Sequence, residues 1–235
     1  MAGLSSHLLA VRAALPHDGE KRFGDRAAAG RRLAALLGQF RGSPALALAI
    51  SPGGVPVAAE LARALRIPLD VFVTREFRAP GCPAAVAGAV SEGGGLCLNG
   101  AALRLPGVAA CAVWREAQLQ QADVAALVGL YRGARPPAVF PRCPVILVDD
   151  GLGSGLAHLA ALRGLRRYHP HQCILATPFG TEAALARVEH ACDSVVCLEI
   201  VGSGEDDPLE RWAWPVCEEE AAAMLARLRG QVGEE

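Results

Sequence analysis

The amino-acid sequence predicts an α/β protein in which a mostly parallel, twisted sheet is covered by helices on both faces. Short runs that are apolar throughout alternate along the chain with longer stretches of helical periodicity. A strand without polar alternation belongs in a sheet that is covered on both sides, and repeated strand–helix order favours parallel pairing. With 235 residues, of which 52% are hydrophobic, the chain is long enough for one domain with a large core.

Six short runs of apolar or β-branched residues are predicted to be strands. In chain order they are ALALAI (45–50), LDVFV (69–73), AVAGAV (85–90), VILV (145–148), CILA (173–176) and SVVCL (194–198). Six longer stretches have helical spacing and are predicted to be helices: 26–40, 55–65, 112–131, 155–168, 182–191 and 218–228. The Pro- and Gly-rich segment 133–144 is too short and too central for a domain boundary, so we expect a single domain over 1–235.

The charge balance excludes several classes of partner. Lys and Arg number 23 and Asp and Glu number 24, giving a formal net charge of −1, and neither sign forms a long block. We therefore expect no nucleic-acid partner and no polybasic membrane patch. The longest apolar runs are only as long as a strand, which is too short for a membrane span. The N-terminal segment does not have the basic residues followed by an uninterrupted apolar stretch that a secretory signal peptide has. These features predict a soluble, cytoplasmic protein.

The eight cysteines do not form a metal-ligand pattern. No two have the Cys-x-x-Cys spacing, and several lie inside apolar runs, where a reduced cysteine behaves as a small hydrophobe. The two histidines of HPH (169–171) are expected in a solvated loop between a helix and a strand. We predict no metal site from either group.

The stretch VILVDDGLGSGLA (145–157) predicts an anion-binding loop at the carboxyl end of a strand. Asp149 and Asp150 follow the strand, and a glycine-rich turn leads into a helix that begins near Leu156. Ligands of such sheets bind at this edge, and glycines and a helix N-terminus direct backbone N–H groups at an anion. Two carboxylates beside a phosphate would repel it unless they face its hydroxyl groups or a divalent cation bridges them.

Three other glycine-rich motifs do not fit this stretch. A dinucleotide-binding loop needs a glycine at position 156 and an acid about 20 residues later, and a Walker loop needs Gly-Lys-Ser/Thr. A nucleophile elbow needs glycines two residues on either side of the serine, but Ser154 has Leu152 and Leu156 there. The simplest alternative is an ordinary turn with an Asp helix cap, which accounts for one aspartate and one glycine only.

At these residues the sequence resembles the type I phosphoribosyltransferases. Their phosphoribosyl pyrophosphate signature is an apolar strand, two acids, a variable pair, then a small residue, Thr or Ser, Gly, a small residue and Thr. Segments similar to the bacterial predicted phosphoribosyltransferase branch occur in the same order, over about 20–200: FGDRAAAGRRLA, GGVPVAAELARAL, PLDVFVTR, APGCP, GAVSEGG and YRGARPP. The resemblance implies that fold, with a small C-terminal hood or helix over about 201–230.

The resemblance also implies roles for individual residues. The implied catalytic residues are Asp149, Asp150 and Arg75; the two aspartates would hold the ribose hydroxyls, partly through Mg²⁺ and its waters. The implied substrate-binding residues are Gly53 and Gly54 for pyrophosphate, Gly151, Gly153, Ser154 and Gly155 for the sugar phosphate, and Arg78. The segment REFRAPGCP (75–83) would be a mobile catalytic loop. Pyrophosphate would be displaced by a nitrogen nucleophile through a ribosyl cation, so catalysis would rest on stabilising the leaving group and excluding water.

The sequence departs from the branch at several site positions. Pro52 replaces an arginine of the pyrophosphate loop, Ala157 replaces the last threonine of the phosphate loop, and Glu76 stands where the branch carries lysine. Leu156 replaces a small residue and is expected to crowd the turn. Arg78 could compensate for the missing cation.

Two functions therefore compete on one fold. The first is a magnesium-dependent phosphoribosyltransferase that uses phosphoribosyl pyrophosphate and a base-like acceptor. The second is a catalytically degenerate relative that binds a phosphosugar or nucleotide in a regulatory role. Trp212 and Trp214 either stack an acceptor base or anchor the tail, and EDDP (205–208) is expected to be a solvated turn. The sequence allows a homodimer without requiring one, and it does not identify the acceptor.

Overall fold

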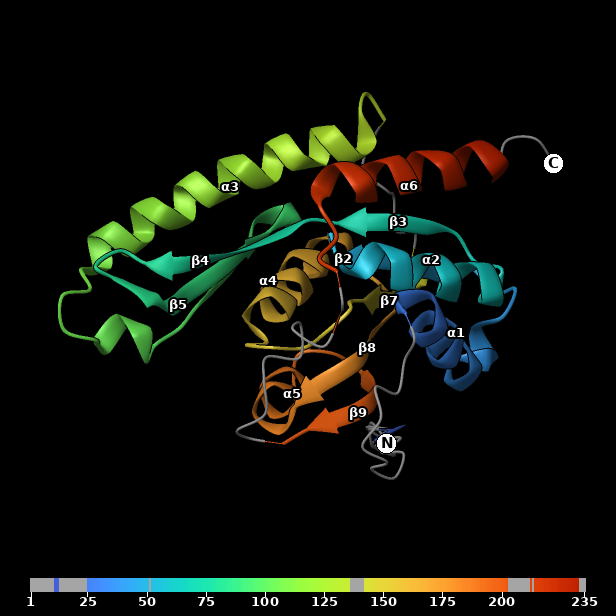
Figure 1. Cartoon of the computed structure of the whole chain (residues 1–235), viewed down its shortest axis with the longest axis horizontal. Coiled ribbons are helices and arrows are strands. Elements are labelled where there is room, and N and C mark those ends of the chain that lie inside the picture. Colours follow the sequence, from blue (N-terminus) through green and yellow to red (C-terminus); the bar gives the residue numbers. More distant parts are fainter. Residues whose placement is uncertain are drawn as a thin grey trace, which may run out of the picture.

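The computed structural model describes residues 11–12, 25–50, 52–135, 142–202, 212 and 214–232. Over these residues the chain forms a six-stranded sheet and a separate three-stranded sheet, with helices packed around both (Figure 1). All pairings in the six-stranded sheet are parallel. The predicted fold class, α/β with a mostly parallel central sheet, is confirmed.

The parallel sheet has the strand order β1-β9-β8-β7-β2-β3. Its strands are β1 (Val11–Arg12), β2 (Leu46–Ile50), β3 (Leu69–Phe72), β7 (Pro144–Val148), β8 (Gln172–Thr181) and β9 (Ser194–Val201). From β2 the chain continues on one side to β3 and later returns on the other side as β7. Such a switch in strand order opens a crevice at the carboxyl ends of the two central strands, where α/β proteins bind their ligands.

Helices cover both faces of this sheet, as predicted. The helices are α1 (Arg26–Leu36), α2 (Gly54–Leu65), α3 (Ala110–Arg132), α4 (Leu156–Leu165), α5 (Glu182–Val188) and α6 (Glu218–Val232). Ala47 and Ala49 of β2 pack with α1 and α2 on one face, whereas Leu46 and Leu48 pack with α4 and α5 on the other. The apolar run of β2 is therefore buried on both sides. No described helix is both long and apolar enough to span a bilayer.

Over the described residues, four short 3₁₀ helices accompany the α-helices, and two of them explain where predicted helices end. They are η1 (Gly38–Phe40), η2 (Glu92–Gly94), η3 (Ala102–Arg104) and η4 (Arg166–Tyr168). The predicted helices 26–40 and 155–168 each end as an α-helix followed by one such turn. The motif HPH lies between η4 and β8, in the expected loop.

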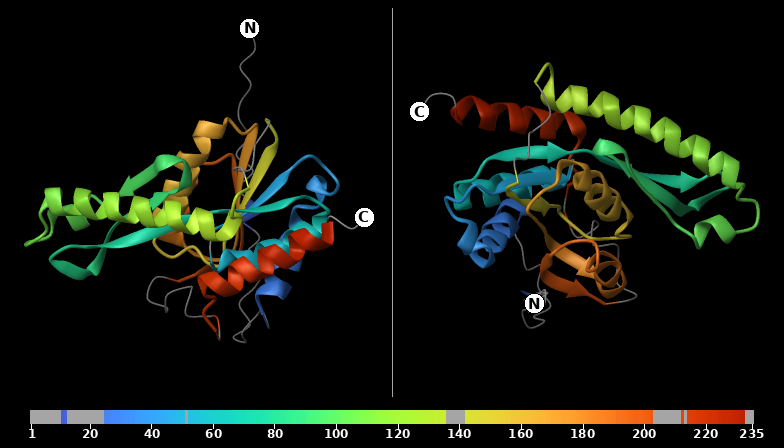
Figure 2. Two further views of the ribbon diagram at one scale, coloured as in Figure 1. Left: turned by 90° about the horizontal axis from the view of Figure 1, so that it is seen from above. Right: turned by 180° about the vertical axis from the view of Figure 1, so that it is seen from behind.

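A second, antiparallel sheet projects from the parallel sheet, and we call it, together with α3, the arm (Figures 1 and 2). Its strands, in the order β4-β5-β6, are β4 (Thr74–Ala79), β5 (Cys82–Ser91) and β6 (Gly95–Leu98). The prediction that 75–83 is a mobile loop is wrong in this structure, because these residues form β4, a tight turn and the start of β5. The run 85–90 likewise belongs to the arm rather than to the parallel sheet.

The pattern of β4 explains why it is a strand. Phe77 and Ala79 are buried against the core, while Glu76 and Arg78, which alternate with them along the strand, are exposed. This is the period-two alternation of a half-buried strand. Gly81, with a φ of +91°, supplies the turn into β5, which any other residue would adopt only with strain. The loop at 75–83 was expected from the family resemblance and not from this alternation.

A buried ion-pair cluster fixes the arm to the parallel sheet. Arg132, near the end of α3, is 4% exposed and pairs with Glu92 of η2 and with Asp70 of β3. Its guanidinium also donates to the carbonyl of Val71, 2.8 Å away. Burial lowers the pKa of Arg132, but the bonds and charges of Glu92 and Asp70 outweigh it and raise that pKa above its ordinary value. Arg229 of α6 pairs with the same Asp70, so α3, α6 and β3 meet at one cluster.

We expect Arg132→Met to lower the free energy of unfolding by about 3–5 kcal/mol, because it removes the cation paired with the buried Glu92 carboxylate and leaves Asp70 with Arg229 alone. Urea unfolding of the variant and the wild type measures this difference. The matched control is Arg115→Met, which removes an exposed arginine from the same helix and should change stability by about 0.5 kcal/mol or less. Equal effects of the two substitutions would contradict a special role for the cluster.

Candidate active site

A cavity of about 490 Å³ lies at the carboxyl ends of β2 and β7, below β4 of the arm. Most of the residues predicted for the site line it: Gly53, Arg75, Arg78, Asp149, Asp150, Gly151, Gly153, Ser154 and Gly155. Gly54 follows the lining residue Gly53 and is the first residue of α2. The departing positions Pro52, Glu76 and Ala157 also line it, together with Arg26, Thr74, His158, Pro215 and Val216, which the sequence did not single out.

The two aspartates follow β7 and are buried. The N–H of Asp149 donates to the carbonyl of Ala176, so parallel pairing with β8 extends one residue beyond the strand. Asp149 Oδ1 accepts from the backbone N–H of Asp150 at 2.8 Å, and its Oδ2 lies 2.8 Å from Nε2 of His158 in α4. Both carboxylates line the cavity, so they are placed to contact a ligand.

Asp150 is held by Arg26, the first residue of α1. The Nε and Nη2 atoms of Arg26 lie 2.8 and 2.7 Å from Asp150 Oδ2. Burial and the neighbouring charge of Asp149 raise the pKa of Asp150 from its ordinary value of 3.8 to about 7, although Arg26 acts in the opposite direction. Arg26 is therefore the cation that favours the ionised form of Asp150.

Trp212 holds Arg26 and Asp150 in place. Its ring lies 4.7 Å from the Arg26 guanidinium carbon, an arrangement typical of a cation–π contact, and its indole N–H donates to the backbone carbonyl of Asp150 at 2.9 Å. Phe179 packs edge-on against the same ring. Trp212 thus anchors the site rather than presenting a free face to a base.

Trp214 differs from Trp212: it is 79% exposed, and its carbonyl accepts from Arg26. Residues 205–208 lie outside the described part of the chain.

Two glycines allow the start of α2 to approach the aspartates. A Cβ atom on Gly54 would lie 2.6 Å from the carbonyl oxygen of Val148, and one on Gly53 would lie 2.4 Å from Asp150 Oδ2. Such distances are well inside van der Waals contact, so a side chain here would push the helix off β7 or displace the carboxylate. The first turn of α2 therefore lies beside Asp150 at the cavity.

The glycine-rich loop leads from the aspartates into α4. Leu152 is buried and bonds through its N–H to the carbonyl of Phe179, and Gly155 has a φ of +76° immediately before the helix. The prediction that Leu156 crowds the turn is wrong, because its side chain is buried in a small cluster between α4 and the arm. Ser154 Oγ accepts from the N–H of Leu156 at 3.0 Å, so it caps the first turn of α4.

The arm brings three charged side chains to the cavity, and each has a partner. Arg75 pairs with Glu218, the first residue of α6, and Glu218 also accepts from the hydroxyl of Tyr131. Arg78 is exposed and donates to the carbonyl of Ala84 at 3.3 Å. The Glu76 carboxylate accepts from the hydroxyl of Ser154 and, at 3.4 Å, from the N–H of Ala157. Long-range contacts of this kind leave no signal in the sequence.

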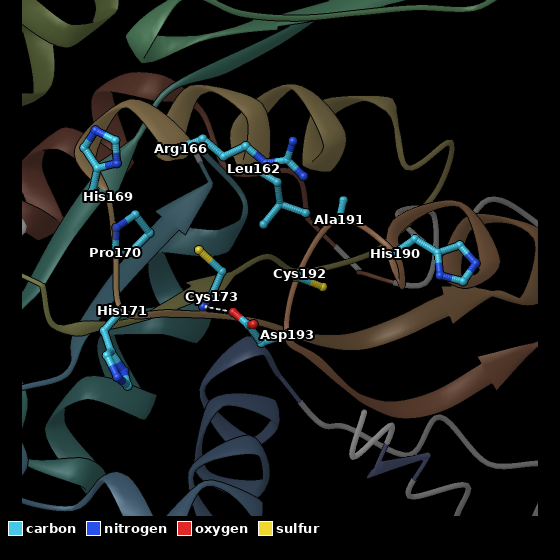
Figure 3. A pocket seen from close by; sticks show the side chains of 10 residues that line it. All are labelled: Leu162, Arg166, His169, Pro170, His171, Cys173, His190, Ala191, Cys192 and Asp193. Atoms are coloured by element: carbon cyan, nitrogen blue, oxygen red, sulfur yellow. Dashed lines mark hydrogen bonds between the residues drawn. The ribbon is translucent and has the colours of Figure 1, made fainter. Parts of the chain in front are cut away.

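A second cavity, of about 530 Å³, lies near the amino ends of β8 and β9 (Figure 3). Its histidines come from two turns, His169 and His171 from the loop before β8 and His190 from the turn after α5, and they point in different directions in Figure 3. Burial raises the pKa of Cys173 to about 11 and that of Cys192 to about 12, so neither thiol is reactive at neutral pH. In the described part of the chain no three His, Cys, Asp or Glu side chains are grouped to hold a metal. We therefore take the first cavity as the candidate site.

Comparison with known proteins relates the chain to phosphoribosyl transferases. The phosphoribosyl transferase domain family matches residues 23–210. Two Mycobacterium tuberculosis proteins (strains CDC 1551 / Oshkosh and H37Rv), each named a putative phosphoribosyl transferase, are 34% identical to it over 178 residues, or 76% of this chain. The chain spans 40% of the length of these relatives. The crystal structure of TT1426 from Thermus thermophilus is 33% identical, with a TM-score of 0.70 over 88% of this chain and 99% of that one.

We expect the titration of Asp150 to make the folded state less stable as the pH rises. Because the pKa of Asp150 is higher in the folded chain than in the unfolded one, the folded chain binds the extra proton between about pH 4 and 7. The contribution of Asp150 to the free energy of unfolding therefore falls as the pH rises through that range.

Urea unfolding of the wild type and Asp150→Asn, at steps between about pH 4 and 8, measures this contribution as the difference between the two proteins. Asp123→Asn on the exposed face of α3 is the matched control. A difference that stays constant across the range would contradict a raised pKa at Asp150.

Proposed function

The chain belongs to the type I phosphoribosyltransferase family, and we propose that it transfers a phosphoribosyl group from phosphoribosyl pyrophosphate to a nitrogen acceptor such as a nucleobase, with release of pyrophosphate. One observation carries the proposal: two buried, adjacent carboxylates, a glycine-rich helix start on either side of them and the arginines of β4 share one cavity. The family match and the names of the mycobacterial relatives support it. The proposal places the reaction in cytoplasmic nucleotide metabolism.

The aspartates are suited to the ribose hydroxyls of this substrate. Asp149 and Asp150 offer acceptor oxygens at the base of the cavity, and hydroxyl groups are donors that a carboxylate binds well. The sugar phosphate would lie at the loop formed by Gly153, Ser154 and Gly155, because the N-terminus of α4 favours an anion there.

The donor set fits a magnesium ion that arrives with the substrate. Mg²⁺ takes hard oxygen ligands, and in nucleotide sites one or two carboxylates are enough because waters and substrate phosphates complete the shell. Asp149 and Asp150 provide such carboxylates, and no described residues form a larger cluster that would hold the ion alone. Bound Mg²⁺ would neutralise charge on the pyrophosphate, and this chain's residues would orient the ribose.

The leaving group would lie between α2 and β4. The backbone of Gly53 and Gly54 gives pyrophosphate a helix N-terminus, which partly offsets the loss of the arginine that Pro52 replaces. Arg75 and Arg78 reach the same cavity from the arm. Since the transition state is a ribosyl cation leaving pyrophosphate, cations and N–H groups aimed at the leaving oxygens lower the barrier. Displacing Arg75 from Glu218 toward the cavity would be part of reaching that state.

The acceptor would enter beside the segment that precedes α6. Pro215 and Val216 line the cavity there, and Trp214 is the exposed aromatic ring next to them. A flat heterocycle stacks well on such a ring. The proposed acceptor is therefore a base-like ring, and its identity is a question for a screen of nucleobases.

A second candidate function is ligand binding without turnover. It is favoured by the contacts of the two arm arginines, since Arg75 is paired with Glu218 and Arg78 with a backbone carbonyl, and by the proline at position 52. In that case the protein would bind a phosphosugar or nucleotide without converting it, and the ligand-bound protein would have a regulatory role. Binding and pyrophosphate release, measured separately, distinguish the two candidates.

We expect phosphoribosyl pyrophosphate to bind in a magnesium-dependent manner, and Asp149→Asn, Asp150→Asn to abolish this dependence because both carboxylates are neutralised. Isothermal titration calorimetry with and without Mg²⁺ measures it. Asp123→Asn serves as the control for loss of a carboxylate elsewhere, and thermal unfolding confirms that each variant folds. Absence of binding to the wild type would overturn the transferase function.

We expect Arg75→Met to slow pyrophosphate release by about tenfold to a hundredfold, the loss of one charge-assisted hydrogen bond to the leaving group, with a smaller change in the dissociation constant. A coupled pyrophosphate assay with a panel of nucleobases provides the rate. Arg115→Met, on the exposed face of α3, should leave it unchanged. Tight binding without pyrophosphate release from any acceptor would favour the second candidate.

A further inference from the structure

The proposed sugar-phosphate subsite already contains an anion that belongs to the protein. The carboxylate of Glu76 accepts from the hydroxyl of Ser154 and from the N–H of Ala157, at the first turn of α4. These are the side-chain and backbone donors that a phosphate would use there. One protein carboxylate therefore occupies the position that the proposed function assigns to a substrate oxygen anion.

The surroundings of the subsite favour a negative charge. The helix N-terminus contributes a partial positive charge, and Arg187 of α5 donates to the backbone carbonyl of Ser154. Because of this bond, the guanidinium of Arg187 lies beside the residue that precedes Gly155 and the start of α4. Glu76 balances this positive field while no ligand is bound.

The Glu76 side chain can leave without unfolding the arm. Glu76 lies on β4, an edge strand of the three-stranded sheet, and its side chain is exposed. The strand is held by its pairing with β5 and by buried Phe77, and neither contact involves the Glu76 carboxylate. Rotation of this side chain into solvent costs its hydrogen bonds to α4 and no buried apolar surface.

We propose that Glu76 is an internal competitor for the sugar-phosphate subsite, so that the residue at position 76 sets the affinity of this subsite for phosphate. The proposal rests on the proposed function, which assigns the subsite to the sugar phosphate. A bound phosphate must displace the Glu76 carboxylate and would then accept hydrogen bonds from the same donors, the hydroxyl of Ser154 and the N–H of Ala157.

The test compares binding of inorganic phosphate and of phosphoribosyl pyrophosphate, at constant Mg²⁺, to the wild type, Glu76→Gln and Glu76→Lys. Glutamine keeps the shape and one acceptor oxygen but not the charge, and lysine reverses the charge. We expect Glu76→Gln to bind both probes about tenfold more tightly, and Glu76→Lys more tightly still. Asp123→Asn, which removes an exposed carboxylate that does not line the cavity, should not change either affinity.

The outcomes separate this proposal from the proposed function. If the wild type binds phosphoribosyl pyrophosphate and the Glu76 variants, shown by thermal unfolding to be folded, bind it no more tightly, the competitor role is wrong and the transferase proposal stands. If neither the wild type nor Glu76→Lys binds either probe, the subsite itself is wrong and both proposals fail. A gain for Glu76→Lys without a gain for Glu76→Gln would also overturn competition, because it would show only that an added cation attracts phosphate.

Discussion

Two neighbouring carboxylates buried at the end of one strand are the constraint around which the rest of the structure is arranged. Each repels the other and each is costly to bury, so each needs a partner from elsewhere in the chain. His158 of α4 faces Asp149, and Arg26 of α1 holds Asp150, with Trp212 stacked on the arginine. The site thus draws together segments from the beginning, the middle and the end of the chain. A protein that only needed stability would have no reason to keep this pair.

The parallel sheet and its helices could be predicted from the sequence because their signals are local. A strand buried on both faces is apolar at every position, as in β2 and β7, and an amphipathic helix repeats every three to four residues. The position of Asp149 and Asp150 followed from the same reasoning, since the carboxyl ends of parallel strands meet at one edge. The glycines 53 and 54 were found through their resemblance to a family motif, and the structure supplies the reason that a side chain does not fit there.

The arm and the partners of the charged residues could not be predicted in this way. The family resemblance implied a loop at 75–83, and in β4 only Phe77 and Ala79 marked a buried apolar face. Arg26 contacts Asp150 across 124 positions of the sequence, and Arg75 contacts Glu218 across 143. Pairs so distant leave no periodicity, and charged side chains in a sequence are read as solvated by default. For the same reason Glu76 was noted as a departure, but its contact with Ser154 was not foreseen.

Successive residues of β4 point to opposite sides of the strand, and this alternation joins the two walls of the cavity. Arg75 reaches α6, and Glu76, the next residue, reaches α4. β4 therefore connects the C-terminal helix with the helix that follows the aspartates. A displacement of β4 large enough to break one of these contacts strains the other, so the movements of the two walls are coupled through the peptide unit that joins residues 75 and 76.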